Sequence, residues 1–325
     1  MISKKYILLL VIILRFLGLA AQPIDNTIIY RNIKNKNYFR FYYDNDFFTA
    51  TDYYYSQGIN LELVHTKLKK FPLTKLLINS AKNVNKYGLA IEHLAYTPSS
   101  IRHTEIIIGD RPFAACFSFK TFSVSVDTVN LWRLGSSLNV GIIGTAAGGE
   151  WMQKTIHRNL NNIEPLGWDH QIHNDIVLNY DITYEQLCIS RKNRISLNSI
   201  CKISVGTLHD KASIGMNLMV GHNLNNSFNE LDATTSNKEI QVKFYNQPLI
   251  NFIGYDATMQ GGLFNRTSPY RLSAREIARI TFEDETGVTL QFKGIYLEYF
   301  QHFITKEFKT GLYHRWGGIR MGVIL

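Results

Sequence analysis

The feature that most constrains this chain is an alternation of apolar and polar residues with a period of two. Between residues 176 and 185, apolar or aromatic side chains occupy every second position, and mostly polar ones stand between them. Successive side chains of a strand point to opposite faces, so such a segment has one apolar and one polar face. Ten to twelve segments show this or related strand signals, near 37–46, 55–65, 86–95, 112–126, 131–144, 173–189, 194–208, 212–222, 239–259, 277–292, 294–308 and 314–325.

Two all-β architectures fit this pattern. One is a soluble β-sandwich with its apolar faces inward, and the other is a closed barrel with its apolar face toward lipid and a polar lumen. The periodicity alone does not separate them. The 18 tyrosines and 19 phenylalanines suit the aromatic girdles of a transmembrane barrel. Long segments such as 173–189 suit a tilted membrane wall, so we expect a transmembrane antiparallel β-barrel.

The N-terminus has the composition of a secretory signal. Two lysines precede the apolar run Ile7–Leu14, and small residues follow at 18–21. A retained anchor helix is the alternative, but the run is shorter than the roughly 20 apolar residues that span a bilayer. We therefore predict a signal peptide at 1–21 and a single domain at 22–325. The three cysteines are too few for a disulfide framework.

The chain is basic, with a formal net charge of +9. A basic exported protein favours an anionic partner. Nucleic acid is chemically possible, but export favours a phosphorylated lipid or an anionic membrane surface, and we expect no nucleic-acid partner. A generic solvated basic surface is the alternative explanation.

One segment, 146–160, is typical of a helix rather than a strand. Glu150 and Lys154 are four residues apart, and so are Gln153 and His157, which places each pair on one helical face. Two glycines before this segment suit a turn leading out of a strand. A short helix in an all-β chain draws attention as a functional element.

Three short motifs could carry chemistry. Tyr-Asp-Asn-Asp-Phe at 43–47 and the hydroxyl-rich segment 51–58 offer the oxygen ligands that Ca²⁺ prefers, although Asp and Asn also simply mark turns. His157 is a candidate base, with a structural or solvent-facing role as the alternative. Gly-Asp-Arg-Pro-Phe-Ala at 109–114 is the third motif, with a local ion pair as the alternative role of its Asp-Arg pair.

Taken in order, these motifs resemble one family. An Asn-Asp pair is followed by Tyr-Ser-Gln-Gly at 55–58, by the motif at 109–114, by Gly-Ile-Ile-Gly at 141–144, and by a glycine pair that leads to Gln153 and His157. Gly-Trp at 167–168 comes next. The series is similar to that of the LpxR-type lipid A 3'-O-deacylases from about residue 43 to 172, and the C-terminal half matches mainly in its strand pattern.

The resemblance implies a barrel of about twelve strands, with a loop helix packed against the wall near the active site at the outer rim. It also implies a Ca²⁺-dependent ester hydrolase in the cell outer membrane. The family's Asn-Asp pair falls on Asn45 and Asp46, its hydroxyl residue on Ser56, and its catalytic histidine on His157. The spacing of the family's glutamate is met one position late, by Glu164.

This assignment makes chemical sense. Ester hydrolysis needs an activated water and stabilisation of the developing oxyanion. An imidazole such as His157 can accept the water's proton, and Glu164 would fix its tautomer. Asp46 and Ser56 would hold a Ca²⁺ ion that polarises the ester carbonyl, and Asn45 would orient the water or donate to the oxyanion.

The implied substrate is lipid A of lipopolysaccharide, which is anionic through its phosphates. Arg111, Gln153 and Lys154 are the predicted substrate-binding residues, with Arg102 and Arg158 nearby. A structural bridge to a lumen carboxylate is the alternative for Arg111. A solvated helix face is the alternative for Lys154 and Arg158.

Three other functions fit parts of the sequence. An outer-membrane phospholipase would share the barrel but use a Ser-His arrangement, and no His-x-Ser pattern accompanies His157. A non-catalytic porin or adhesin would not need the catalytic set. A soluble exported β-sandwich lectin would lack the membrane barrel. We expect the protein to act as a monomer.

Overall fold

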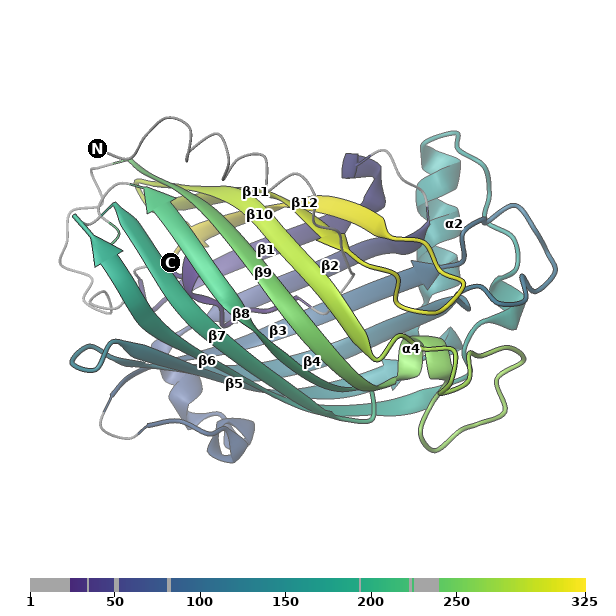
Figure 1. Cartoon of the computed structure of the whole chain (residues 1–325), viewed down its shortest axis with the longest axis horizontal. Coiled ribbons are helices and arrows are strands. Elements are labelled where there is room, and N and C mark those ends of the chain that lie inside the picture. The colour runs from purple at the N-terminus through teal and green to yellow at the C-terminus, as the bar shows by residue number, and fades with distance from the viewer. Residues whose placement is uncertain are drawn as a thin grey trace.

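Twelve antiparallel strands in the described part of the chain form one closed barrel (Figure 1). The computed structural model describes residues 24–33, 35–49, 53–80, 83–192, 194–221, 224 and 240–325, and the predicted signal peptide lies outside these residues. The strands are β1 (Tyr38–Asn45), β2 (Tyr54–Val64), β3 (Val84–Thr97), β4 (Ala114–Asp127), β5 (Trp132–Ile143), β6 (Asp175–Arg191), β7 (Ile195–Gly206), β8 (His209–Gly221), β9 (Gln241–Asp256), β10 (Ile280–Phe292), β11 (Ile295–Ile304) and β12 (His314–Ile324).

The helices are short. They are η1 (Ile29–Arg31), η2 (Asp46–Thr49), η3 (Thr66–Lys70), η4 (Pro72–Leu76), η5 (Thr145–Ala147), α2 (Gly149–Asn159), η6 (Trp168–His170) and α4 (Ala257–Gln260). Within the described residues, none is long and apolar enough to cross a membrane as a helix. The helix predicted at 146–160 is confirmed as η5 followed by α2.

Each strand pairs with its neighbours in the chain, and the barrel closes between the first and the last strand. Along that seam Tyr38 is opposite Ile324, and Asn45 is opposite Gly317. Closure satisfies the backbone groups that would otherwise line two open sheet edges. The prediction of a closed barrel of about twelve strands is therefore confirmed, and the β-sandwich alternative is wrong.

The period-two pattern sorts side chains between lumen and exterior. On β10, Thr281, Glu283 and Glu285 are buried, whereas Ile280 and Val288 are exposed. A sandwich would bury the apolar set, but here the polar set is inside. Polar-in, apolar-out alternation is typical of a barrel whose wall faces lipid.

The two ends of the barrel differ. The connections β3–β4, β5–β6 and β9–β10 are long and lie at the end that carries α2, which we call the loop rim (Figure 1). The C-terminus lies at the opposite end, where the turns β4–β5, β6–β7 and β10–β11 are short. The strand ends that hold Asn45 and Ser56 lie at the loop rim, and so does the β5–β6 connection that carries His157 and Glu164.

Candidate active site

The first part of the site forms where β1 ends and β2 begins. Asn45 is the last residue of β1, and its Nδ2 donates to the backbone oxygen of Ser56 at 2.6 Å. Its Oδ1 accepts the backbone N–H of Phe47 at 2.8 Å, which starts the turn η2 at Asp46. The structure thus brings together three residues that the sequence assigned to one site: Asn45, Asp46 and Ser56.

Ser56 occupies an irregular position in β2. The pairing of β2 with β3 shifts register between Tyr55 and Gln57, so Ser56 is the extra residue of a β-bulge. Tyr54, just before it, has a φ of 71°, a region that costs a non-glycine residue on the order of 1–3 kcal/mol. Bulges beside active sites re-aim a side chain. Here the Ser56 hydroxyl lies 2.8 Å from that of Thr97 on β3.

The chemistry of this corner suits a hard cation. Asp46 is 5% exposed and supplies a carboxylate, and Ser56 is 7% exposed and supplies a hydroxyl. Oxygen ligands of this kind are those that Ca²⁺ prefers. In the described ranges, no group of three or more His, Cys, Asp or Glu residues forms a metal cluster. A cation here would therefore need further oxygen ligands from backbone, water or substrate.

Helix α2 is anchored tightly to the barrel wall. A Cβ added at Gly149 would lie 2.4 Å from the Cβ of Ala115 on β4 and 2.7 Å from the Trp168 ring, so only glycine allows this approach. The indole Nε1 of Trp168 donates to Oε1 of Gln153 at 2.8 Å. Gln153 is buried and this bond holds the helix, and its predicted contact with substrate stays a prediction.

The helix also reaches the strand that carries Ser56. Nε2 of Gln57 lies 2.7 Å from Sδ of Met152, which joins β2 to α2. The next turn of the helix carries His157. The two halves of the candidate site therefore lie at the same rim and are connected through neighbouring residues.

The backbone fixes the tautomer of His157. Its Nδ1 lies 2.5 Å from the carbonyl oxygen of Ile163. Since a carbonyl oxygen only accepts, Nδ1 carries the hydrogen, and in the neutral ring Nε2 then presents its lone pair. A neutral imidazole held in this way can accept a proton. The sequence suggested Glu164 for this orienting role, and the structure places a backbone carbonyl there.

The charged residues around α2 pair with one another. Glu164 Oε1 lies 3.5 Å from Arg158 Nη2, and Lys154 Nζ lies 2.7 Å from Glu150 Oε1. The Arg158–Glu164 pair is well exposed, as the solvated-face alternative predicts. The structure does not test the catalytic role of Glu164 or the substrate-binding role of Lys154, and both stay predictions.

Arg111 lies apart from this group. Its side chain is 1% exposed, and the guanidinium donates to Glu307 at 2.5 Å and to Thr258 Oγ1 at 2.6 Å, above the ring of Tyr96. These contacts match the structural-bridge alternative. Burial raises the pKa of Glu307 to about 7, although Arg111 acts to lower it. No sequence motif marks Glu307 as the partner of Arg111, because it lies 196 residues further along the chain.

A family model and a solved structure agree with this fold. The family model described as outer membrane protein LpxR matches residues 7–325. Among solved structures, LpxR from Salmonella typhimurium superposes with a TM-score of 0.73 at 19% identity, covering 89% of this chain and 100% of that chain. The β domain of the Bordetella autotransporter BrkA gives a TM-score of 0.44 at 8% identity, covering 89% of this chain and 99% of that chain. No curated protein matches the chain in sequence.

Proposed function

The chain belongs to the LpxR family of outer-membrane proteins, and from that premise we propose that it is an ester hydrolase that removes an acyl chain from lipid A. The observation that carries the proposal is the way in which His157 is oriented and positioned. A backbone carbonyl fixes its tautomer, and its helix packs on the wall beside the corner formed by Asn45, Asp46 and Ser56.

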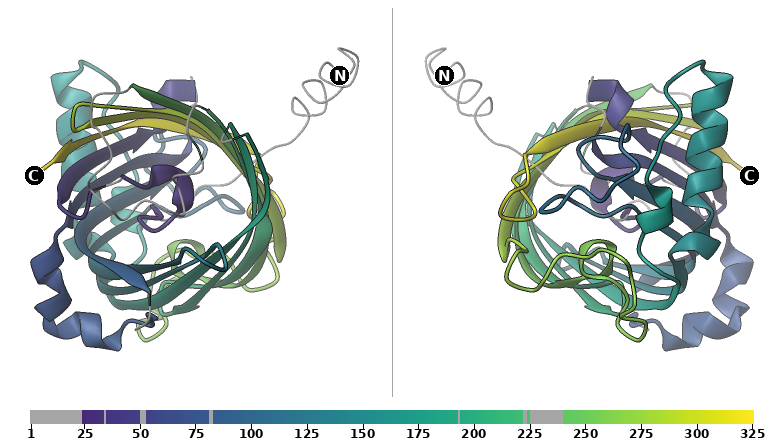
Figure 2. Two further views of the ribbon diagram at one scale, coloured as in Figure 1. Left: turned by 90° about the vertical axis from the view of Figure 1, so that its left-hand side faces the viewer. Right: turned by 90° about the vertical axis from the view of Figure 1, so that its right-hand side faces the viewer.

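The surroundings of the site suit an amphipathic lipid. Seen along the barrel axis, α2 lies at the periphery of the ring of strands, where a lipid could approach from the side (Figure 2). Trp151 and Leu160 on and after this helix are each 71% exposed, and Phe47 is 80% exposed. Exposed apolar residues at a rim that faces lipid headgroups can hold acyl chains, and nearby cations can pair with phosphates.

In the proposed mechanism, Nε2 of His157 accepts a proton from water as the water attacks the ester carbonyl. General-base help of this kind is worth about 10²–10⁴ in rate. The second hydrogen of Asn45 Nδ2 makes only a long contact with the Tyr43 hydroxyl at 3.4 Å, so it can turn to the developing oxyanion instead. The imidazolium formed at His157 then returns its proton to the leaving alkoxide.

Asp46 and Ser56 would hold the Ca²⁺ ion that the family resemblance implies. When bound, such an ion polarises the ester carbonyl as a Lewis acid. The bulge at Ser56 and the turn at Asp46 lie at one corner of the rim, because Asn45, next to Asp46, donates to the backbone oxygen of Ser56. We propose that Glu164 acts as a positioning residue, because its ion pair with Arg158 steadies the loop that supplies the Ile163 carbonyl.

Substrate recognition is assigned to the cations at the rim. Lys154 is partly exposed and can exchange its partner Glu150 for a lipid phosphate. Arg111 contacts Glu307 and Thr258 in two other loops, and its predicted contact with substrate stays a prediction. We propose that the protein acts as a monomer, because one barrel carries both halves of the site.

The test is incubation of detergent-refolded protein with purified lipid A, with the products identified by mass spectrometry. One sample contains Ca²⁺, one contains EDTA, one contains His157→Ala, and one contains His103→Ala, which changes an exposed histidine of the same rim. We expect loss of one acyl chain in the Ca²⁺ and His103→Ala samples, and intact lipid A in the other two.

Intact lipid A in every sample of folded protein would refute the proposal. Release of fatty acid from phospholipid in the same assay would then favour a phospholipase, and inactivity on both substrates would favour a non-catalytic barrel.

A further inference from the structure

The barrel lumen contains a segment of the chain that belongs to neither the wall nor the rim. We propose that residues 24–33, which we call the N-terminal plug, are an intramolecular ligand of the lumen and seal the barrel against the passage of ions. This inference goes beyond the proposed hydrolysis and does not depend on it.

The plug lies deep inside the ring of strands. The left panel of Figure 2, which views the barrel from the end that carries the C-terminus, shows η1 in purple within the ring of strands. Ile28 and Ile29 are 0% exposed, and Tyr30 is 1% exposed. The Tyr30 ring stacks on that of Tyr245 on β9, with centroids 3.8 Å apart. Such burial of a segment without regular strand structure requires partners for its backbone groups.

The wall supplies those partners. Four basic side chains from four different strands each donate to a backbone carbonyl of the plug: Arg40 to Arg31 at 2.6 Å, Lys120 to Ile24 at 2.9 Å, Arg133 to Thr27 at 2.8 Å, and Lys86 to Ile33. Glu185 accepts the N–H of Ile29 at 3.3 Å. Long cationic side chains that reach a backbone from several sides form a built site for an extended peptide.

Side chains of the plug add specificity. The guanidinium of Arg31 contacts both Glu285 and Glu298, the latter at 3.5 Å. The carboxylate of Asp25 lies 2.9 Å from Nζ of Lys202. A buried charge is costly without its partner, so an empty lumen would expose or strand these wall charges. The pairing therefore favours an occupied lumen.

The wall is also shaped for the plug. A Cβ added at Gly135 on β5 would lie 2.5 Å from the Cβ of Thr27. Any side chain at that wall position would collide with the plug. Glycine gives a strand no side chain to pack, and here it marks the close approach of another backbone.

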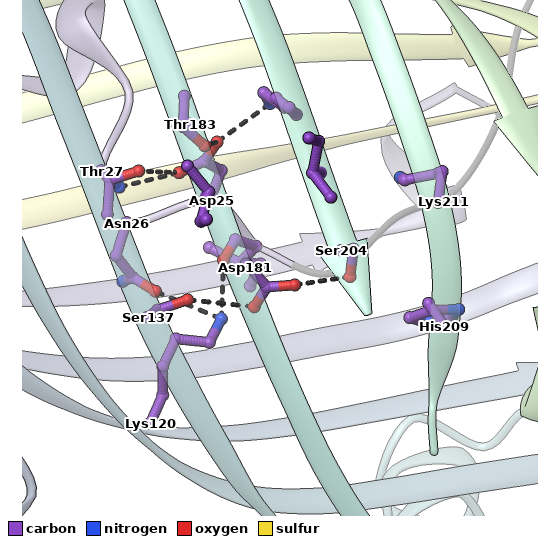
Figure 3. A pocket seen from close by; sticks show the side chains of 14 residues that line it. Asp25, Asn26, Thr27, Lys120, Ser137, Asp181, Thr183, Ser204, His209 and Lys211 are labelled. Atoms are coloured by element: carbon purple, nitrogen blue, oxygen red, sulfur yellow. Dashed lines mark hydrogen bonds and ion pairs between the residues drawn. The ribbon is translucent and has the colours of Figure 1, made fainter. Parts of the chain in front are cut away.

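Small cavities border the plug, and one of about 30 Å³ lies beside Tyr30 and Arg31. A cavity of about 70 Å³ separates Asp25, Asn26 and Thr27 from His209 and Lys211 on β8 (Figure 3). That volume holds a few water molecules and offers them polar partners. Barrels of eight strands are filled by side chains, whereas those of 16–18 leave a channel. In this barrel of twelve strands, the plug fills lumen space that the side chains of the wall alone leave open.

The experiment is single-channel recording in planar lipid bilayers with KCl on both sides, using the full chain. We compare the wild type with Arg31→Glu, which places a third carboxylate against Glu285 and Glu298. Arg275→Glu is the control, because it makes the same charge change on an exposed loop residue. We expect no unit current steps from the wild type or the control, and resolvable open-channel steps from Arg31→Glu.

A second variant keeps the test valid if the Arg31→Glu protein fails to fold. Tyr30→Ala removes the ring stacked on Tyr245 without burying a new charge, and it should also give current steps. A synthetic peptide of residues 24–33 should then reduce those steps, whereas the same peptide with Arg31→Glu should not. Steps from the wild type, or folded plug variants as silent as the control, would overturn the proposal.

Discussion

Because α2 packs closely on the barrel wall, we predict that one added methyl group lowers the rate of hydrolysis and leaves the stability of the barrel unchanged. In Gly149→Ala the new Cβ would lie 2.4 Å from the Cβ of Ala115, whereas carbon atoms in contact normally lie about 3.5–4.0 Å apart. The start of the helix must therefore retreat by about 1 Å. Alanine gains about 1 kcal/mol of helix propensity over glycine, so the helix persists in its displaced position.

A displacement of this size should lower kcat on lipid A about 100-fold, because a misplacement of about 1 Å can cost that much. The urea midpoint of barrel unfolding should stay close to that of the wild type, since the strand ladders are untouched. Both quantities are measurable on the same refolded sample, by mass spectrometry and by tryptophan fluorescence.

The matched control is the pair Ala115→Gly and Gly149→Ala combined. Removing the opposing methyl group makes room for the new one, so the double variant should recover part of the lost rate, and Ala115→Gly alone should stay active. The Trp168 ring, also within 2.7 Å, limits the recovery. Wild-type activity in Gly149→Ala, or a lost rate that follows a shifted unfolding midpoint, would refute this reasoning.

Four further predictions follow from the site. Asp46→Asn should lower activity at least about 100-fold and weaken Ca²⁺ binding measured by calorimetry, and Ser56→Ala should weaken that binding with the barrel still folded. Glu164→Gln should cost less than about tenfold in rate, because a backbone carbonyl already orients the proposed base; an effect as large as loss of the histidine would show direct catalysis. Arg111→Ala should destabilise the protein by about 3–5 kcal/mol in urea unfolding above pH 7, where Glu307 is ionised and would be left without its partner, and an increase in KM at unchanged stability would instead favour substrate contact. Burial raises the pKa of Glu307 from 4.5 to about 7, so its contribution to the unfolding free energy is fully present below pH 4.5 and is lost as the pH rises through 7. The unfolding free energy should therefore fall by about 3 kcal/mol between these two pH values, and Glu307→Gln should flatten this pH dependence.

The wall of the barrel was predictable because its physics is local. A strand with one face in the lumen and one toward lipid must alternate, and the expected segments 37–46 and 131–144 match β1 and β5 to within a residue at each end. The helix was predictable for a similar reason, since Gly148 and Gly149 end the strand pattern just before residues spaced for a helical face.

The candidate site was predictable in its residue types and not in its contacts. Asn45 and Ser56 were assigned to one site, and the pairing of β1 with β2 brings them together. The partner of His157 is a backbone carbonyl, which every residue possesses, so no residue type could have marked it. The Arg111–Glu307 pair joins two distant loops, and a single sequence holds no record of such proximity.

The plug was not predictable, because a segment bound by side chains of many strands needs no periodicity of its own. Its carbonyls are recognised by Arg40, Lys120 and Arg133, whose role depends entirely on the closed barrel. On the sequence, these residues are simply polar positions in alternating strands.

The pairing of β1 with β12 has a consequence for how the protein folds. Asn45 is paired with Gly317, and Asp44 with Gly318, so the first strand reaches its final position only when the last one docks. Contacts this distant in sequence carry a large loop-closure entropy and form late in folding. Hydrolytic competence should therefore appear together with the last step of assembly, and partly assembled chains should leave lipid untouched.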